Sequence, residues 1–417
     1  MDFNDTPQEA AFRKEVHTWL EANAERKQED QAAVFGPTAE LQISQKSIDA
    51  SRSWQGKKFN AGWAGITWPK EYGGRGGTAM ENIVFRQEES QFKVPEDVFG
   101  LGIGLAAPTI MVHGTEEQKQ KFLKPTLEGE LIWCQLFSEP SAGSDLAGLR
   151  TKAVKDGDEW VINGQKVWNS GAHYADWGIL VTRSDFDAPK HKGLTYFLVD
   201  MKSPGIDVRP IQQITGGSSF SEVFFTDVRI PDANRLDAVG NGWAVSITTL
   251  MNERVMIGSG RGLTPKLMLS EITRVTSVAY IDGVLADQHP AVRQRIGEFY
   301  ARVKALELTG QRVLSAVAKG KRPGPEGSAL KLATGILQQE IAAFAMELQG
   351  PLGIMRGEDT LACNGFWQEL YIRIPATRIA GGSDEIQRNI IGERILGLPP
   401  EQRVDKGIPY KDIPIGR

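Results

Sequence analysis

The chain has 417 residues, is 41% hydrophobic and 24% charged, and carries a net charge of −4. This length favours two or three packed units that can enclose a deep pocket, and the acidic balance argues against nucleic acid as a partner. The apolar runs are short and interrupted, and the first residues are acidic and polar. We therefore expect a cytoplasmic protein without a membrane span or a signal peptide.

Residues 1–130 are predicted to form an N-terminal helical domain. A polar stretch over 28–45 indicates a loop or irregular insertion, and a helix is expected over 47–59. Helix starts are marked by three capping boxes, which begin at Thr6, Thr78 and Thr115.

Residues 131–235 are predicted to form a β-domain of short strands, because β-rich runs alternate there with Asp-Gly, Asn-Gly and Pro-Gly turns. No helix separates the runs, so we predict an antiparallel barrel or sandwich rather than a parallel dinucleotide-binding sheet. Helical periodicity returns over 236–417 and predicts a four-helix bundle with a polar tail. The expected fold class is α+β. The four clearest β-rich runs cover 159–162, 178–182, 195–199 and 222–225.

The sequence predicts no metal centre. Cys134 and Cys363 are the only cysteines and have no paired spacing, and the five histidines form no His-x-x-x-His or His-Glu pair. His113 and His173 have no evident partner, so we interpret both as loop or helix-end residues rather than acid–base groups.

Glu253 and Arg254 lie side by side within an apolar run of helical spacing over 248–257. Leu250, Arg254 and Ile257 recur on one stripe of such a helix, and Glu253 lies on the adjacent stripe. One interpretation is a solvated glutamate on an amphipathic helix. The other is a carboxylate that points into a cavity.

Two glycine-containing segments of the β-region, 135–145 and 164–171, are candidates for a cofactor site. No phosphate loop or Gly-x-Gly-x-x-Gly fingerprint follows a strand, so a nucleotide cofactor would have to bind elsewhere. Turns rich in small residues leave backbone N–H groups exposed, and Trp168 offers a flat apolar face to a planar ring. The alternative is that both segments are ordinary turns.

Together these segments resemble the acyl-CoA dehydrogenase family of flavoproteins, and the resemblance runs from the first helix to about Pro399. That family has a helical domain, a central β-domain and a C-terminal helical bundle, which is the order of the three patterns above. Five stretches carry the resemblance by their order and spacing: Gly65-Ile66-Thr67-Trp68-Pro69-Lys70-Glu71-Tyr72-Gly73-Gly74, Ser138-Glu139-Pro140-Ser141-Ala142-Gly143-Ser144-Asp145, Asn163-Gly164-Gln165-Lys166-Val167-Trp168, Asp227-Val228-Arg229-Ile230-Pro231 and Gly382-Ser383-Asp384-Glu385-Ile386-Gln387-Arg388-Asn389.

The resemblance implies that FAD lies between the β-domain and the C-terminal bundle, and that Ser144 meets either the pantetheine of a CoA thioester or the edge of FAD. Since a neighbouring subunit supplies much of the FAD contact in such enzymes, a homotetramer or homodimer is implied. The implied isoalloxazine contacts are Phe137 and Ser138 on one side and Trp168 and Ser170 near N5, and Gln135 is a further implied contact of FAD. The implied contacts of the AMP half are Glu347, Gly350, Ser383 and Glu385.

The implied reaction is the α,β-dehydrogenation of an acyl-CoA to the trans-2-enoyl-CoA, as in fatty-acid β-oxidation. A carboxylate removes the α-proton while the β-hydride leaves to flavin N5, and an electron-transfer flavoprotein is the implied electron acceptor. Closure of the pocket by acyl chain and flavin desolvates the carboxylate, which raises its pKa and strengthens it as a base. Charge on the thioester oxygen requires fixed N–H or O–H donors.

The sequence departs from the family at the usual position of the base. Many members carry a glutamate directly before a Gly-Thr or Gly-Ser pair, and that position is Gly381 here. A minority branch carries the base in a Glu-Arg pair on the first long helix after the β-domain, which corresponds to Glu253 and Arg254. We therefore predict Glu253 as the base and Arg254 as the residue that orients it. Gly381 is expected to donate its backbone N–H to the thioester oxygen, with Gly382 beside the substrate.

A second departure concerns the flavin diphosphate. The family's Arg-x-x-Phe-Gly run, with a glutamine downstream, corresponds here to Ala279-Tyr280-Ile281-Asp282-Gly283, which lacks the arginine. Either other groups compensate, or a related partner subunit supplies the arginine in a heterotetramer.

Three functions remain open at this point. The leading one is an FAD-dependent acyl-CoA dehydrogenase. The others are a flavin oxidase or monooxygenase of the same fold, and a non-catalytic subunit that binds acyl-CoA or stabilises a partner. Glu253 favours a catalytic role, because a purely structural subunit needs no carboxylate at that position.

Overall fold

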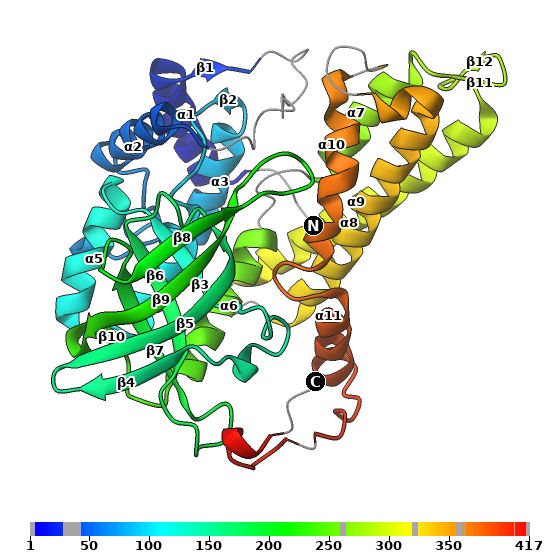
Figure 1. Ribbon diagram of the computed structural model, residues 1–417. Helices are drawn as coiled ribbons and strands as arrows, with labels where there is room; N and C mark the ends of the chain where they lie inside the picture. Colours follow the sequence, from blue (N-terminus) through cyan, green and yellow to red (C-terminus); the bar gives the residue numbers. More distant parts are fainter. Residues whose placement is uncertain are drawn as a thin grey trace.

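The computed structural model describes residues 5–27, 43–258, 264–318, 324–355, 361, 363–403 and 405–413. Most of the predicted loop over 28–45 lies outside these residues. Figure 1 shows N-terminal helices in blue and cyan, a central sheet in green, and C-terminal helices in yellow to red. The predicted α+β fold class, with helical, β and helical parts in that order, is confirmed.

All three predicted capping boxes open N-terminal helices. At each one the threonine hydroxyl accepts a hydrogen bond from the backbone N–H three residues on, and the side-chain oxygen of that residue accepts a bond from the threonine N–H. The two-stranded sheet β1 (Glu25–Arg26) and β2 (Phe92–Lys93) lies among these helices. The helices are α1 (Pro7–Asn23), α2 (Gln45–Asn60), α3 (Ala79–Glu89), α4 (Ala107–His113) and α5 (Glu116–Glu128).

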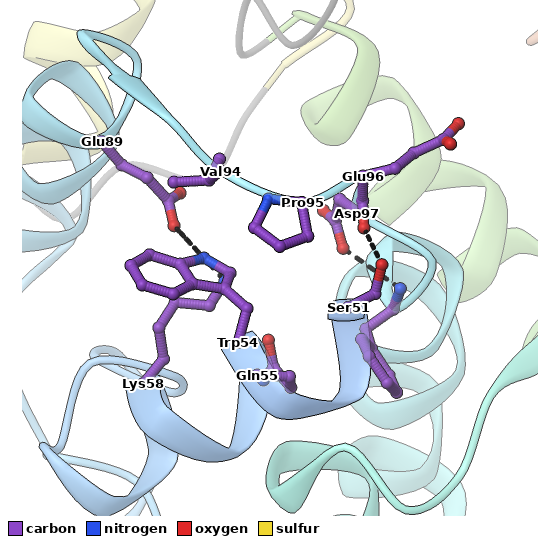
Figure 2. Close-up of a pocket in the computed structure, with 10 residues that line it drawn as sticks. Ser51, Trp54, Gln55, Lys58, Glu89, Val94, Pro95, Glu96 and Asp97 are labelled. Carbon is purple, nitrogen blue, oxygen red and sulfur yellow. Dashed lines mark hydrogen bonds and ion pairs between the residues drawn. The ribbon is translucent and has the colours of Figure 1, made fainter. Parts of the chain in front are cut away.

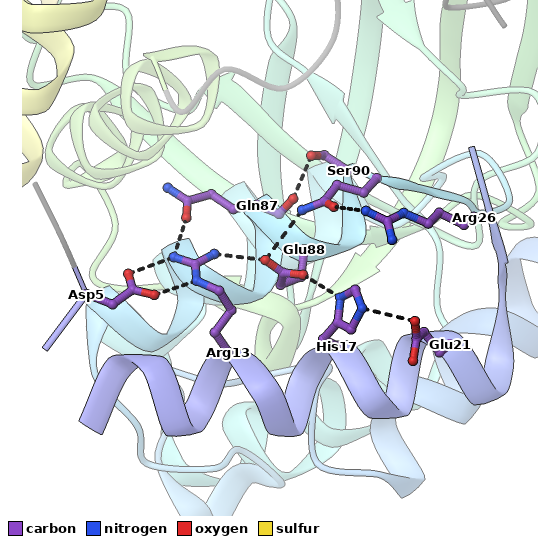
Figure 3. Close-up of polar contacts among 9 residues, drawn as sticks. Asp5, Arg13, His17, Glu21, Arg26, Gln87, Glu88 and Ser90 are labelled. Atoms are coloured by element: carbon purple, nitrogen blue, oxygen red, sulfur yellow. Dashed lines mark hydrogen bonds and ion pairs between the residues drawn. The ribbon is translucent and has the colours of Figure 1, made fainter. Parts of the chain in front are cut away.

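A buried carboxylate ties α1 to α3. The Arg13 guanidinium donates to Glu88 Oε1 at 2.9 Å, and His17 Nδ1 lies 2.9 Å from Glu88 Oε2. Figure 3 shows both side chains reaching from α1 to this single carboxylate. Because Glu88 is nearly fully buried, its charge needs such partners.

The central sheet has eight strands in the order β10-β7-β6-β4-β5-β9-β8, with β3 paired to β6. The predicted antiparallel pairing holds for most neighbours but is wrong for β3 and β4, which both run parallel to β6. For β3, the long crossover that a parallel pair needs contains the β4–β5 hairpin. The strands are β3 (Trp133–Leu136), β4 (Lys152–Asp156), β5 (Glu159–Ser170), β6 (Trp177–Arg183), β7 (Leu194–Asp200), β8 (Ile206–Ile211), β9 (Phe220–Pro231) and β10 (Arg235–Leu236).

Both faces of the central strands are covered. Ile179 and Val181 of β6 pack with the core formed by α4, α5 and the start of the first C-terminal helix, whereas Leu180 packs into a second core on the opposite face. Strand side chains alternate between the two faces of a sheet. Because neither face of β6 is exposed to solvent, its sequence is a continuous apolar run.

The C-terminal part is built around α9, which packs against α6, α7, α8, α10 and α11. Its buried Leu337, Ile341 and Ala345 share one core with Phe299 of α8 and Trp367 of α10. Among the described residues, none of the helices combines the length and apolarity that a membrane crossing requires. The elements are α6 (Gly242–Gly258), α7 (Pro265–Thr276), β11 (Tyr280–Ile281), β12 (Val284–Leu285), α8 (Pro290–Ala318), α9 (Glu326–Gln349), α10 (Phe366–Arg373) and α11 (Asp384–Ile390).

Candidate functional site

The two candidate cofactor segments of the β-domain lie side by side. The Asn169 side-chain amide donates to Gln135 O at 2.7 Å, and Val167 N donates to Ser138 O at 2.9 Å. Lys166 Nζ donates to Phe137 O at 2.9 Å. The structure thereby brings together the two segments that carry the five FAD contacts predicted for the β-domain, Gln135, Phe137, Ser138, Trp168 and Ser170.

Trp168 is the most exposed of the aromatic side chains in this cluster. It lies in an irregularity of the β5–β9 pairing and has the unusual left-handed φ of +62°. Its indole is 60% exposed and packs edge-on against Phe220. A non-glycine residue in this conformation needs support from its surroundings. The exposed indole face of Trp168 is a flat apolar surface on which a planar ring could stack. Phe137, by contrast, is buried against Tyr196.

A buried ion pair, which the sequence did not reveal, fixes the backbone of this cluster. Lys166 Nζ lies 2.9 Å from Glu139 Oε1, and the Glu139 carboxylate also accepts bonds from Thr151 N at 2.8 Å and Arg150 N at 2.7 Å. Burial disfavours ionisation of Glu139, but Lys166 and the donors from Thr151 outweigh it and hold the pKa of Glu139 below its ordinary value. Glu139 thus closes a loop over 139–151, and Ser144 is exposed on that loop.

The helix that carries Glu253 is anchored by polar contacts near its middle. His113 Nδ1 lies 2.7 Å from Asp237 Oδ2, and His113 Nε2 lies 2.8 Å from the hydroxyl of Thr248 on α6. The Thr249 hydroxyl is hydrogen-bonded to Tyr196. These contacts fix the position of α6 between the sheet and α9.

His113 is the last residue of α4, so the prediction of a helix-end residue is confirmed, but the premise that nothing pairs with it is wrong. Its partners lie 124 and 135 residues further along the chain, a distance that no local pattern reports. For His173, neither buried ring nitrogen has a hydrogen-bond partner within the described part of the chain, and burial lowers the pKa of this side chain.

A lysine of α9 bonds the glycine turn before α11. Lys331 of α9 donates from Nζ to Gly382 O at 2.5 Å. Burial lowers the pKa of Lys331, and the carboxylate charges of Asp384 and Glu253 act in the opposite direction. Glu253 lies on α6, which packs against α9, so α9 connects the helix of Glu253 to the turn at Gly382, although the two are far apart in sequence. Arg254 also lies on α6, but its side chain is outside the described part.

The turn itself requires glycine. Gly381 and Gly382 have φ values of +65° and +95°, a region that other residues adopt at a cost. A Cβ at Gly382 would lie 2.5 Å from Nε2 of Gln387, which donates to both glycine carbonyls at 3.0 and 3.1 Å. This pattern fixes the orientation of the peptide groups on which an oxyanion role depends.

The predicted contacts of the AMP half fall into two separate places. Ser383 is the N-cap of α11 and accepts from Ile386 N, and Glu385 is exposed in the first turn of that helix. Glu347 is exposed at the other end of α9 from Lys331, and Gly350 follows it. Sixteen residues of helix span about 24 Å. These positions are not brought together within one chain.

The hairpin that corresponds to the family's diphosphate-binding run is β11–β12. Its turn is formed by Asp282 and Gly283, both with positive φ, and Tyr280 is 67% exposed beside it. The hairpin residues 280–285 include no cation. The β-domain cluster therefore suits a planar flavin ring, whereas this hairpin does not suit a diphosphate.

A recess of about 220 Å³ lies in the N-terminal part, between α2 and the chain that follows α3. Figure 2 shows the Trp54 indole at its rim, with Nε1 donating to Glu89 at 3.2 Å and Lys58 beside the same carboxylate. None of the predicted site residues lines it. Within the described ranges, no group of three or more His, Cys, Asp or Glu side chains could hold a metal ion.

Comparison with known proteins gives successive matches along the chain. The acyl-CoA dehydrogenase N-terminal, middle and C-terminal domain models match residues 6–130, 134–228 and 240–396. Acyl-CoA dehydrogenase FadE34 of Mycobacterium tuberculosis is 41% identical over 334 residues, which are 80% of this chain, and the chain spans 44% of that relative's length. Acyl-CoA dehydrogenase IpdE1 of the same organism is 35% identical over 94% of this chain and 98% of its own. A solved structure described as the Tcur3481-Tcur3483 steroid ACAD is 27% identical, with a TM-score of 0.77 over 96% of this chain and 100% of that chain.

Proposed function

Because the chain belongs to the acyl-CoA dehydrogenase family of FAD-dependent oxidoreductases, we propose that Glu253 is the base that removes the α-proton of an acyl-CoA thioester. The observation that carries this proposal is the packing of α6, which bears Glu253, against α9, whose Lys331 donates to Gly382 O. Through α9, the helix with the only carboxylate of the 248–257 run is connected to the glycine turn that stands at the usual position of the base.

The proposed reaction forms the Cα–Cβ double bond by removing a proton from Cα and a hydride from Cβ. The α-proton moves to the carboxylate of Glu253, and FAD, when bound, accepts the β-hydride. Gly381 donates its backbone N–H to the thioester oxygen, on which negative charge develops, and Gly382 and Ser144 contact the substrate. Arg254 orients Glu253. Removal of water by the bound acyl chain strengthens the base.

The proposed flavin contacts come from two chains. The ring is assigned to Gln135, Phe137, Ser138, Trp168 and Ser170 of the β-domain, whose cluster supports this role. The AMP half is assigned to Glu347, Gly350, Ser383 and Glu385, some of them from a neighbouring subunit. Glu347 is separated along α9 from Lys331 and the turn that precedes Ser383. One chain therefore cannot offer all four residues to a single AMP half, which supports a contribution from both subunits.

We expect anaerobic addition of the correct acyl-CoA to bleach the flavin of the purified protein. The panel comprises butyryl-CoA, octanoyl-CoA, palmitoyl-CoA and a CoA thioester of a steroid carboxylic acid; the last is included because a structural relative is described as a steroid ACAD. Loss of flavin absorbance is followed in a stopped-flow instrument. Free CoA is the control, and the absence of bleaching with every thioester would favour a non-catalytic subunit.

The fate of the electrons separates dehydrogenase from oxidase. We propose that an electron-transfer flavoprotein receives them, so the substrate-reduced flavin should reoxidise slowly in air and rapidly with that acceptor. Fast reoxidation by oxygen would instead support the oxidase or monooxygenase alternative.

We propose further that the chain assembles with a related subunit into a heterotetramer. The cation-free β11–β12 hairpin and the double name of the Tcur3481-Tcur3483 relative support this. The chain purified alone is expected to hold well under one FAD per chain, and co-expression with a partner that carries the arginine should raise the FAD content. The measurement is the flavin-to-protein absorbance ratio together with mass by light scattering. One tightly bound FAD per chain in a homo-oligomer would contradict heteromeric assembly.

A further inference from the structure

The loop over 139–151, here named the signature loop, is held from behind by a buried arginine. Arg183 at the end of β6 is fully buried. Its guanidinium donates to Ala147 O at 2.5 Å and its Nε donates to Leu149 O at 3.0 Å. The arginine thus bonds the half of the loop that follows Ser144 and Asp145.

A segment from the far end of the chain covers this arginine. Residues 405–413, here named the C-terminal strap, run along the loop that joins β6 to β7. Tyr410 N donates to Ala188 O and Lys411 N donates to Phe186 O, each at 3.0 Å. Figure 1 shows the strap, in red, passing from the C-terminal helices to the edge of the β-domain. Two backbone bonds in succession define a docked segment rather than a chance contact.

Tyr410 connects the strap to the signature loop. Its ring lies over the Arg183 guanidinium, with Cζ 3.5 Å from the ring centroid. Its hydroxyl donates to Gly148 O at 2.7 Å. Because the Tyr410 side chain makes both contacts, it fixes the Arg183 guanidinium and the Gly148 carbonyl relative to each other.

Lys190 makes a second connection. Its Nζ lies 3.0 Å from Asp145 Oδ1 and is also paired with Asp405 of the strap. Asp145 directly follows Ser144, the residue proposed to contact the substrate. The ammonium group therefore bridges the strap and the exposed part of the signature loop.

We propose that the C-terminal strap positions the signature loop for substrate binding, with Tyr410 as a positioning residue. The part of this inference that concerns substrate rests on the proposed function, because it takes Ser144 to contact the CoA thioester. Docked, the strap holds Gly148 and Asp145 in place and so holds the backbone that carries Ser144. Released, it leaves the loop fixed only by groups of the β-domain, Glu139 and Arg183 among them.

Hydrogen exchange of the full-length protein tests the contact itself. Tyr410→Ala removes both ring and hydroxyl, and Tyr410→Phe removes only the hydroxyl. Lys411→Ala is the matched control, because it removes only an exposed ion pair with Asp187 of the β6–β7 loop, and such a pair contributes little to docking of the strap. We expect amide exchange in peptides from 140–150 to be about tenfold faster in Tyr410→Ala, less accelerated in Tyr410→Phe and unchanged in the control. Equal exchange in the native protein and Tyr410→Ala would overturn the inference.

Kinetics then test the role in substrate binding. With the thioester that bleaches the native flavin best, Tyr410→Phe is expected to raise KM several-fold while the rate of flavin reduction at saturation changes less than about twofold. Faster exchange with an unchanged KM would overturn the positioning role. If no thioester bleaches the native protein, the proposed function fails, whereas the exchange result still decides whether the strap orders the loop.

Discussion

Replacement of Glu253 by glutamine is expected to slow anaerobic flavin reduction by about 10³-fold, since a positioned general base contributes roughly 10²–10⁴. The amide keeps the size and shape of the carboxylate but cannot accept the α-proton. The measurement is stopped-flow bleaching with the best thioester of the panel, together with the FAD content of the variant. A variant that retains its FAD and loses only the bleaching rate identifies a chemical role rather than a structural one.

Two further variants sharpen this result. Glu298→Gln on α8 removes an exposed carboxylate that pairs with Arg295 and should bleach at the native rate. Lys331→Met retains Glu253 but removes the donor to Gly382 O, so it tests the glycine turn separately from the base. Equal bleaching rates in Glu253→Gln and the native protein would show that another group is the base.

Replacement of Lys166 by methionine is expected to lower the free energy of unfolding by about 3–5 kcal/mol, the usual loss when one partner of a buried ion pair is removed. The Glu139 carboxylate would remain buried without its cation, and Phe137 O would lose its donor. Urea unfolding monitored by tryptophan fluorescence gives the change. Lys152→Met, at an exposed position of β4, is the matched control and should lie within about 0.5 kcal/mol of the native protein.

The pH dependence of this loss follows from the pKa of Glu139, which the folded protein holds below its ordinary value. Stabilisation from such a group is present above the unfolded pKa and is lost as the pH falls through the folded pKa. In Lys166→Met burial opposes the ionisation of Glu139 without the cation, so the carboxyl is protonated at a higher pH than in the native protein. The difference in the free energy of unfolding between the variant and the native protein should therefore narrow toward acid pH. The double variant Glu139→Gln, Lys166→Met should lose less than the single one, and a loss equal to the sum of both single variants would contradict the pairing.

Local features of this protein were predictable from sequence because their partners are neighbours in the chain. The capping box at Thr6 needs only Glu9, and the apolar run over 195–199 lies within β7 because alternation and turns report a strand directly. Long-range pairings were not predictable in this way. The parallel pairing of β3 with β6 joins Trp133 to Trp177 across a hairpin, and no local pattern distinguishes it from an antiparallel one.

The same difference between local patterns and long-range contacts applies to the residues of the candidate site. Trp168 and Glu253 could be selected from motif and pattern, and the structure gives each a specific setting. The sequence does not single out Lys166 or Lys331 as functional residues, because a lysine in a strand or an apolar helix usually extends its ammonium group to solvent. Only the folded chain shows that one is fully buried against Glu139 and that the other bonds Gly382.

The left-handed backbone at Gly381 limits which side chains this turn can carry. A glutamate introduced at 381 would have to adopt a φ near +65°, at a cost of about 1–2 kcal/mol, or the turn would have to change shape and release the bonds from Gln387. A carboxylate at this turn therefore requires a change in the backbone as well as in the side chain.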